Sequence, residues 1–200
     1  MTVSIVAYGL GNLGSVTNML RRIGADSRLV QTPEEIAASD RLLLPGVGAF
    51  GAGMALLEQR GLVPAIRAFA ASGRPVLGIC LGMQLLLEGS EEGDAEGLGL
   101  IPGRSHRLPP SAIRVPHMGW NLVTPTRADP LVGGLPDASR FYFVHSYHAV
   151  PEDPAHILGV TTYGVPFASM IRSENVMGAQ YHPEKSHDFG KRVLANFARL

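Results

Sequence analysis

Cys80, the only cysteine of the chain, lies in the segment Gly78-Ile79-Cys80-Leu81-Gly82. The apolar run Pro75–Ile79 predicts a buried strand, and Leu81–Glu88 is rich in helix formers. A cysteine on such a strand-to-helix turn, with glycines two positions to either side, has the pattern of a nucleophile elbow. The N–H groups of the following helix favour a thiolate and can bind an oxyanion. The alternative is an inert buried cysteine that packs as a small apolar side chain, and the flanking glycines favour the nucleophile.

His182 and Glu184 flank a proline in the segment Gln180-Tyr-His-Pro-Glu-Lys185. In an extended segment residues i and i+2 point the same way, and Pro183 fixes its own φ while keeping His182 extended. A carboxylate behind a histidine sets the tautomer and stabilises the imidazolium, as in nucleophile–base–acid triads. The sequence therefore predicts a triad with Cys80, against the alternative of a solvated loop pair.

A third candidate is the segment Gly9-Leu10-Gly11-Asn12-Leu13-Gly14, which follows one predicted strand and opens a helix. This spacing is typical of dinucleotide binding, but that mechanism also needs an acidic residue at the end of the second strand. That strand ends in Leu29-Val30-Gln31-Thr32, without an acid. The segment is better interpreted as a tight turn whose glycines allow close packing, with Asn12 as a helix cap.

Composition excludes several other functions. Lys+Arg 17 balances Asp+Glu 17 and no basic run stands out, which disfavours binding to nucleic acid or to an anionic membrane. One cysteine allows no intramolecular disulfide. The seven histidines, including His145 and His148, do not complete a ligand set, so we expect no metal and no cofactor. The first 20 residues lack a basic residue and are broken by glycine and asparagine, so we expect neither signal peptide nor membrane span, and a cytoplasmic location.

The elements that must position these residues follow an α/β pattern. Two hundred residues fit a single domain, residues 1–200. In the first half, apolar runs alternate with amphipathic segments, which indicates a parallel sheet. The predicted strands are Val3–Ala7, Ser27–Val30, Leu42–Leu44 and Pro75–Ile79. The predicted helices are a segment from Leu13 to Ile23 closed by Gly24, a short Pro33–Ala38, a stretch from Ala52 to Ala71 interrupted near Gly61–Pro64, and Leu81–Glu88.

From Gly89 the sequence changes to short strand-like pieces between Gly, Pro and acidic turns, which predicts a mixed or antiparallel β-rich half. These pieces are Leu98–Ile101, Arg104–Leu108, His117–Val123, Arg140–His145, His156–Tyr163, Pro166–Ile171 and Val176–Tyr181. A final helix begins at Ser186, as N-cap, with Phe189, Val193, Phe197 and Leu200 on one face. Because parallel strands present working residues at their carboxyl ends, we expect the site at the loops after Ala7, Leu44 and Ile79.

Together, the Cys80 segment, the Pro45–Gly48 loop and the His182-Pro-Glu184 segment resemble the class I (triad) glutamine amidotransferases. Further blocks narrow the resemblance, over essentially the whole chain, to the glutaminase subunits of imidazole glycerol phosphate synthases. These blocks are Tyr8–Val16, Leu44–Gly51, Gly78–Gln84, Pro116–Asn121 and Tyr142–Tyr147. One departure is Ala7, where relatives commonly carry Asp. The resemblance implies a three-layer, flavodoxin-like fold.

The resemblance also implies roles for individual residues. Cys80 would attack the side-chain amide of glutamine, His182 would protonate departing ammonia, and Glu184 would orient His182. Around the oxyanion and the bound glutamine the family positions are Val47, Gly48, Leu81, Gln84, Ser146 and Tyr147. Near a partner interface they are Asn12, Trp120, Tyr142 and Lys185.

That partner, by the same resemblance, is a (β/α)₈ cyclase subunit that forms a heterodimer with the glutaminase and consumes its ammonia. Two glycines in Pro45–Gly48 make a loop able to switch conformation, and we predict that partner and ligand binding favour the state that completes the oxyanion site. Three alternatives remain open from sequence: supply of ammonia to another synthase, a cofactor-binding module using Gly9–Gly14, and a catalytically dead scaffold.

Overall fold

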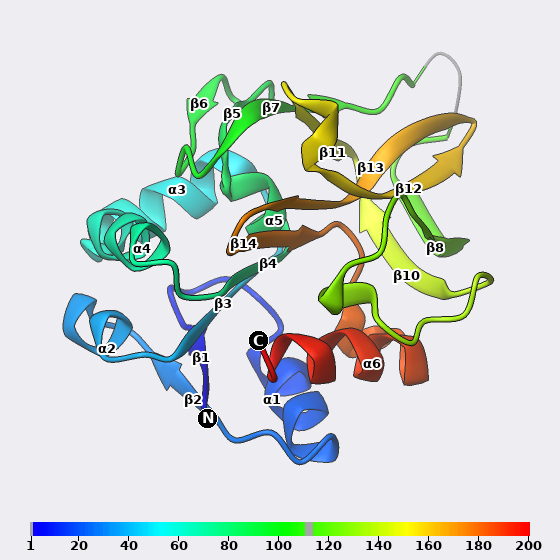
Figure 1. The fold of residues 1–200 in the computed structure, drawn as a ribbon. Coiled ribbons are helices and arrows are strands. Elements are labelled where there is room, and N and C mark those ends of the chain that lie inside the picture. The colour runs from blue at the N-terminus through cyan, green and yellow to red at the C-terminus, as the bar shows by residue number, and fades with distance from the viewer. Residues whose placement is uncertain (1, 111–113) are drawn as a thin grey trace.

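A computed structural model describes residues 2–110 and 114–200 of the chain. Five parallel strands form one half of its main sheet, in the order β2-β1-β3-β4-β14, with β2 at the edge (Figure 1). Their bounds are β1 Val3–Val6, β2 Ser27–Val30, β3 Arg41–Gly46, β4 Val76–Cys80 and β14 Val176–Ala179. The parallel sheet predicted for the first half is therefore confirmed, and one strand from the end of the chain completes it.

Beyond β14 the same sheet continues through mostly antiparallel pairs, in the order β13-β11-β7-β5-β6, and β5 and β7 are parallel. The bounds are β13 Val165–Ser173, β11 Tyr147–Pro151, β7 Ile101–Arg107, β5 Leu87–Ser90 and β6 Ala95–Glu96. In addition, β12 Ile157–Tyr163 pairs with β13, and β9 Thr124–Pro125 pairs with β12. A separate antiparallel pair joins β8 His117–Leu122 to β10 Arg140–His145. The predicted mixed, β-rich second half is confirmed.

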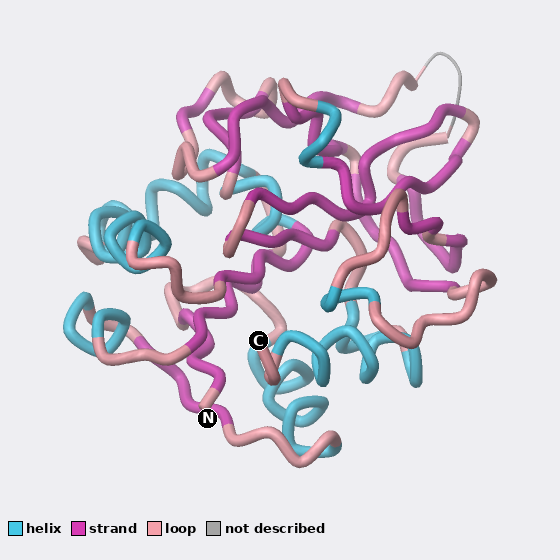
Figure 2. Tube along the Cα trace, viewed as in Figure 1, coloured by secondary structure: helices cyan, strands magenta, loops and turns pink. Residues whose placement is uncertain are grey.

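Helices cover both faces of the parallel strands, which gives three layers (Figures 1 and 2). On one face lie α2 Pro33–Ala37, α3 Phe50–Gln59, α4 Leu62–Ala71 and α5 Leu81–Leu85; on the other lie α1 Leu13–Arg22 and α6 His187–Phe197. Short 3₁₀ helices span Pro130–Val132, Pro154–His156 and Pro183–Lys185. No helix in the described ranges is long and apolar enough to span a membrane.

Strands β1, β3, β4 and β14 are mostly apolar because both of their faces are buried. In β3, Leu42 and Leu44 join the core beneath α3 and α4, whereas Leu43 joins the core beneath α1 and α6. The face predicted for the final helix is confirmed for Val193 and Phe197, which are fully buried, and for Phe189, which packs partly buried against the same core. Leu200 also packs there, but it lies beyond the end of α6. Burying both faces of the sheet holds the carboxyl ends of the strands, and so the loops after them, in fixed positions.

The predicted helix Leu81–Glu88 is wrong in its second half. Helix α5 ends at Leu85, and β5 begins at Leu87. The carbonyl groups of residues 85–88 accept hydrogen bonds from the N–H groups of residues 97–101 instead of continuing the helix. The predicted strands Leu98–Ile101 and Arg104–Leu108 correspondingly become this pairing segment followed by β7. Helix propensity was overridden by a tertiary strand pairing.

Other predicted boundaries differ less. The break in the stretch Ala52 to Ala71 is confirmed, since Gly61 separates α3 from α4 with a φ of +66°. Strand β3 runs further than Leu42–Leu44 and includes Pro45 and Gly46, whereas β14 ends at Ala179, before Tyr181.

Candidate active site

Cys80 is the last residue of β4 and directly precedes α5. Its backbone has φ +54° and ψ −110°, a conformation that L residues rarely adopt and that is typical of a nucleophile elbow. The glycines predicted to permit the turn are required by space: a Cβ on Gly82 would overlap the carbonyl oxygen of Leu44, and one on Gly78 would crowd the backbone of Gly82. The strained turn places the sulfur, which is almost fully buried, at the edge of a cavity.

His182 and Glu184 contact each other as predicted, with Nδ1 of the imidazole 2.8 Å from Oε1 of the carboxylate. The backbone route differs from the prediction, because Pro183–Lys185 is a 3₁₀ helix and only His182 is extended. Both side chains are at most 2% exposed. Burial lowers the pKa of His182, but interactions with Cys80 and Glu184 outweigh it and raise the pKa to about 9. This imidazole is therefore held ready to carry a proton.

Ser186 fixes the backbone around His182. Its hydroxyl donates to the carbonyl oxygen of His182 at 2.6 Å and accepts from the N–H of Tyr142 at 3.0 Å, while His182 N–H donates to Tyr142 O at 2.9 Å. Ser186 occupies the N-cap position of α6 as predicted, but its hydroxyl caps no helical N–H. Strand β10 thus holds the His182 turn in place.

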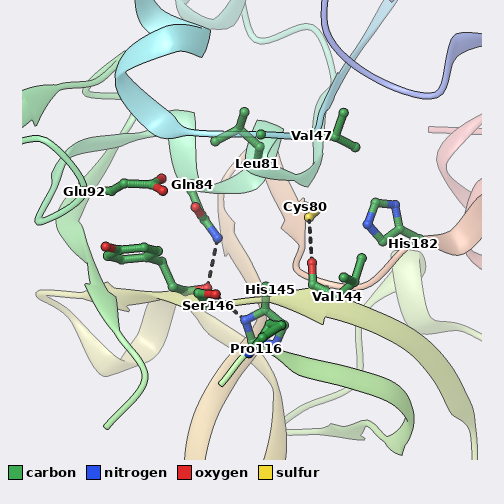
Figure 3. Close-up of a pocket in the computed structure, with 12 residues that line it drawn as sticks. Val47, Cys80, Leu81, Gln84, Glu92, Pro116, Val144, His145, Ser146 and His182 are labelled. Carbon is green, nitrogen blue, oxygen red and sulfur yellow. Dashed lines mark hydrogen bonds between the residues drawn. The ribbon is translucent and has the colours of Figure 1, made fainter. Parts of the chain in front are cut away.

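The cavity at the elbow has a volume of about 280 Å³ (Figure 3). Its lining includes Cys80, His182 and all six residues predicted to surround oxyanion and glutamine, namely Val47, Gly48, Leu81, Gln84, Ser146 and Tyr147. Glu184 lies behind His182 rather than in the lining. The Nε2 atom of His182 makes no hydrogen bond to the described residues. Because His182 and Cys80 line the same cavity, this nitrogen is available to exchange a proton with groups there. The thiol itself is 3.8 Å from Val144 O.

Four lining residues were not predicted: Glu92, Pro116, Val144 and His145. Glu92 accepts a 2.8 Å hydrogen bond from the N–H of Phe50, at the start of α3, so its carboxylate is held beside the cavity. In the sequence it belongs to the acidic turn Glu91-Glu92-Gly93-Asp94, which is indistinguishable from a solvated loop. Only the tertiary pairing of that turn with α3 reveals it.

The loop after β3 approaches the elbow closely. Gly46 is paired with Cys80 in the parallel ladder, and a Cβ at Gly46 would lie 2.8 Å from Gly82 N and 2.9 Å from the hydroxyl oxygen of Tyr8. Val47 is 38% exposed, and Gly48 has a φ of +102°. Pro45 in turn packs at 3.0 Å from where a Cβ of Gly11 would stand, so the Gly9–Gly14 turn serves close packing, as interpreted from its sequence.

The four predicted interface residues come from four segments of the chain. Trp120 on β8 and Tyr142 on β10 are register partners, with ring centroids 6.0 Å apart, and Lys185 Nζ lies 5.8 Å from the Tyr142 ring centroid. Asn12 occupies the N-cap position of α1 without a side-chain cap hydrogen bond, and α1 packs against the 183–185 turn. Within the described ranges no group of three or more His, Cys, Asp or Glu side chains could hold a metal ion.

Residues 5–200 match the family model "Glutamine amidotransferase class-I". The structure of PurLQS from Thermotoga maritima has the same fold, with a TM-score of 0.79 at 19% identity, covering 99% of this chain and 97% of that one. A strained cysteine elbow beside a buried His–Glu pair on this fold defines the class of triad glutamine amidotransferases.

Two bacterial relatives carry the name "Imidazole glycerol phosphate synthase subunit HisH". That of Symbiobacterium thermophilum is 51% identical, covering 99% of this chain and 93% of that protein. That of Sulfurimonas denitrificans is 48% identical, covering 98% and 97%. The chain belongs to the class-I glutamine amidotransferases and, within them, to the family of HisH subunits of imidazole glycerol phosphate synthase.

Replacing Glu184 by glutamine should lower the pKa of His182 below its wild-type value of about 9, because the neutral amide no longer stabilises the imidazolium while burial still opposes it. The hydrogen bond to Nδ1 can persist, so we expect a folded protein. Titration of the His182 ring by NMR checks the shift, and kcat for glutamine should fall by about 10²-fold or more. An unchanged titration would show that Glu184 does not stabilise the charged ring.

Proposed function

We propose that this chain is the glutaminase subunit of an imidazole glycerol phosphate synthase, which hydrolyses glutamine to glutamate and ammonia in histidine biosynthesis. The observation that carries the proposal is the arrangement of Cys80, on a strained elbow, with the buried His182–Glu184 pair at one cavity of about 280 Å³. Residues 1–200 act in it as one amidotransferase domain of the cytoplasm, without a cofactor.

The chemistry follows from the groups at the cavity. The thiol of Cys80 gives its proton to Nε2 of His182, and the sulfur attacks the side-chain amide carbon of glutamine. The developing oxyanion is stabilised by the backbone N–H of Leu81 and by one from the Val47–Gly48 loop. His182 returns the proton to the leaving nitrogen, so ammonia departs and a thioester remains. Water, deprotonated by His182, then releases glutamate and restores the thiol.

Glutamine also has a charged end that the cavity must recognise. Among the described lining residues, Glu92 is the carboxylate, and it suits the α-ammonium group of the substrate. Gln84 donates its amide N–H groups to Tyr147 O at 2.9 Å and to Gln180 Oε1 at 3.1 Å, which leaves its own carbonyl oxygen for the ligand. Ser146 lies at the same wall (Figure 3). Together these groups favour a small zwitterion that ends in an amide.

The face that carries Trp120 is suited to docking the cyclase subunit, a (β/α)₈ barrel, as a heterodimer. Met118, Trp120 and Leu122 alternate along β8 and are 62%, 44% and 41% exposed. Side chains two residues apart share a face of a strand, so they form one apolar stripe. The opposite strand of this pair, β10, leads to the cavity through Val144. Ammonia released beside such an interface has a short route to the partner.

Glutamate release should be slow for the chain alone and strongly stimulated by a cyclase subunit of imidazole glycerol phosphate synthase with its nucleotide ligand. The physical reason is the Pro45–Gly48 loop, whose two glycines let partner binding create the second oxyanion donor. The measurement is glutamate formation with each component added in turn. Trp120→Asp, which places a charge on the apolar stripe, should remove the stimulation.

The outcomes separate the parts of this proposal. High activity of the chain alone would keep the glutaminase and exclude gating by the loop. Absence of activity in every mixture, with a cyclase shown to bind, would favour a catalytically dead scaffold.

A further inference from the structure

His117 and His145 form a buried pair beside the cavity. They are the register partners that close the β8–β10 ladder, and their side chains meet with His117 Nδ1 2.9 Å from His145 Nε2. The two residues are 2% and 6% exposed. His145 lines the cavity, as Figure 3 shows, whereas His117 contacts His145 and is not part of the lining. The mechanism described above uses neither imidazole.

The hydrogen bonds at both ends fix where the protons lie. Asn121 Nδ2 donates to Thr162 O at 3.0 Å and contacts His117 Nε2 at 3.3 Å, so this ring nitrogen must accept. At the other end His145 Nδ1 is 2.8 Å from Tyr147 O, a carbonyl that can only accept. Each imidazole is therefore neutral and carries its proton on Nδ1. Asn121 donates to His117, His117 donates to His145, and His145 donates to Tyr147 O; we call this series of hydrogen bonds the relay.

A second proton on either ring has no acceptor to reach. On His145 it would oppose the N–H of His117, and on His117 it would oppose the Asn121 amide. Burial lowers the pKa of His117 to about 4, and burial together with the nearby histidines lowers that of His145 to about 3. The titratable groups that face the pair are Tyr163, stacked on His117 with ring centroids 4.1 Å apart, and His148 and His182 near His145.

The relay ends on the atom that orients the glutamine subsite. Tyr147 O accepts from His145 Nδ1 and also from Gln84 Nε2 at 2.9 Å. Because this carbonyl can only accept, it sets which end of the Gln84 amide faces it. Gln84 Nε2 also donates to Gln180 Oε1, which fixes the orientation of the Gln180 amide. The Nε2 atom of Gln180 then lies 3.9 Å from Cys80 Sγ. Two runs of hydrogen bonds thus meet at Tyr147 O: one is donated from Asn121 through the two histidines to this carbonyl, and the other leads from Gln84, which also donates to it, through Gln180 to the sulfur.

We propose that His117 and His145 are positioning residues: as neutral Nδ1–H imidazoles they hold the Tyr147 carbonyl, and through it the Gln84 amide, in the orientation that binds glutamine. This inference rests on the proposed glutaminase function and extends it to two residues outside the triad. It concerns binding of the substrate rather than reactivity of the sulfur, and the two effects can be measured separately.

The test is alkylation of Cys80, in the full chain assembled with the cyclase subunit and its nucleotide ligand, by diazo-oxo-norleucine, a glutamine analogue that attaches through its diazo carbon with loss of N₂. Its KI reports the subsite and its kinact the chemistry, while iodoacetamide reports thiol reactivity alone. His145→Leu should raise KI about tenfold, the equivalent of one lost hydrogen bond, with iodoacetamide labelling unchanged. His145→Asn, whose Nδ2 can replace the Nδ1 donor, should recover most of the affinity.

Phe167→Leu is the matched control, since Phe167 packs on both rings without a hydrogen bond to either. It should leave KI at the wild-type value. Equal KI values for His145→Leu and Phe167→Leu, or no recovery in His145→Asn, would overturn the positioning role. The proposed glutaminase function also requires that the analogue labels Cys80 of the wild type and that the labelling rate saturates with analogue concentration. If only iodoacetamide labels Cys80, the proposed function fails first.

A second readout needs no substitution. Imidazole ¹⁵N chemical shifts of the wild-type chain should show two histidines that remain neutral and protonated on Nδ1 at pH 5.5. Either ring found as the Nε2–H tautomer, or charged at that pH, would contradict the direction of the relay even if every variant failed to fold.

Discussion

Replacing Cys80 by alanine should reduce glutamate release by the assembled enzyme at least about 10³-fold, the largest effect on catalysis expected of any single substitution. Alanine removes the atom that forms the thioester, and the cavity holds no second thiol because Cys80 is the only cysteine. His182 could then only act on water, without the covalent step that divides the reaction. Glutamate formation in the presence of the cyclase subunit and its nucleotide measures the loss.

The same variant should keep its fold and its substrate site. Alanine can occupy the elbow at no greater steric cost than cysteine, and Glu92, Gln84 and the His117–His145 relay are unchanged. Glutamine should therefore still raise the melting temperature of Cys80→Ala, by an amount set by its concentration relative to Kd. Retained glutaminase activity in this variant would place the nucleophile elsewhere and remove the basis for the triad.

The parts of the site that could be predicted from sequence share one property: the local backbone conformation that they need is set by glycine or proline residues nearby in the sequence. Gly78 and Gly82 are spaced as a strained turn requires, and Pro183 restricts the conformation of His182. For His182 and Glu184 the predicted contact is confirmed, but the extended backbone predicted for the whole segment is wrong after His182. The fixed φ of Pro183 starts a 3₁₀ turn here, and the short loop still brings Glu184 to His182.

The parts that could not be predicted depend on contacts between distant segments. Glu92 reaches the cavity because its carboxylate accepts from Phe50 N, 42 residues away. The second half of the helix predicted after Cys80 becomes β5 because the segment around Leu98 supplies donors for its carbonyl groups. His117 and His145 become a directed pair only through the register of β8 with β10. None of these pairings leaves a periodicity or spacing in the sequence.

Gly82→Ala should destabilise the chain by at least about 3 kcal/mol, at the upper end of the usual range for overpacking. The added Cβ would overlap the carbonyl oxygen of Leu44, a backbone atom of β3 that is held between two parallel neighbours and cannot move alone. The gain of up to about 1 kcal/mol that alanine brings to a helix is too small to offset this. Urea unfolding, followed by the midpoint at constant m value, measures the change.

Gly51→Ala is the matched control, because Gly51 lies in α3 and the nearest atom to its added Cβ is Ala95 Cβ at 3.9 Å. This substitution should be neutral or stabilising by up to about 1 kcal/mol. If Gly82→Ala behaves like Gly51→Ala, the close approach of α5 to β3 does not hold the elbow. If instead it folds with a lowered midpoint, glutaminase activity should fall more than stability alone explains, because a displaced Leu44 also carries Pro45 and Gly46 away from Cys80. The residue that makes the turn possible would then also set the distance between nucleophile and oxyanion loop.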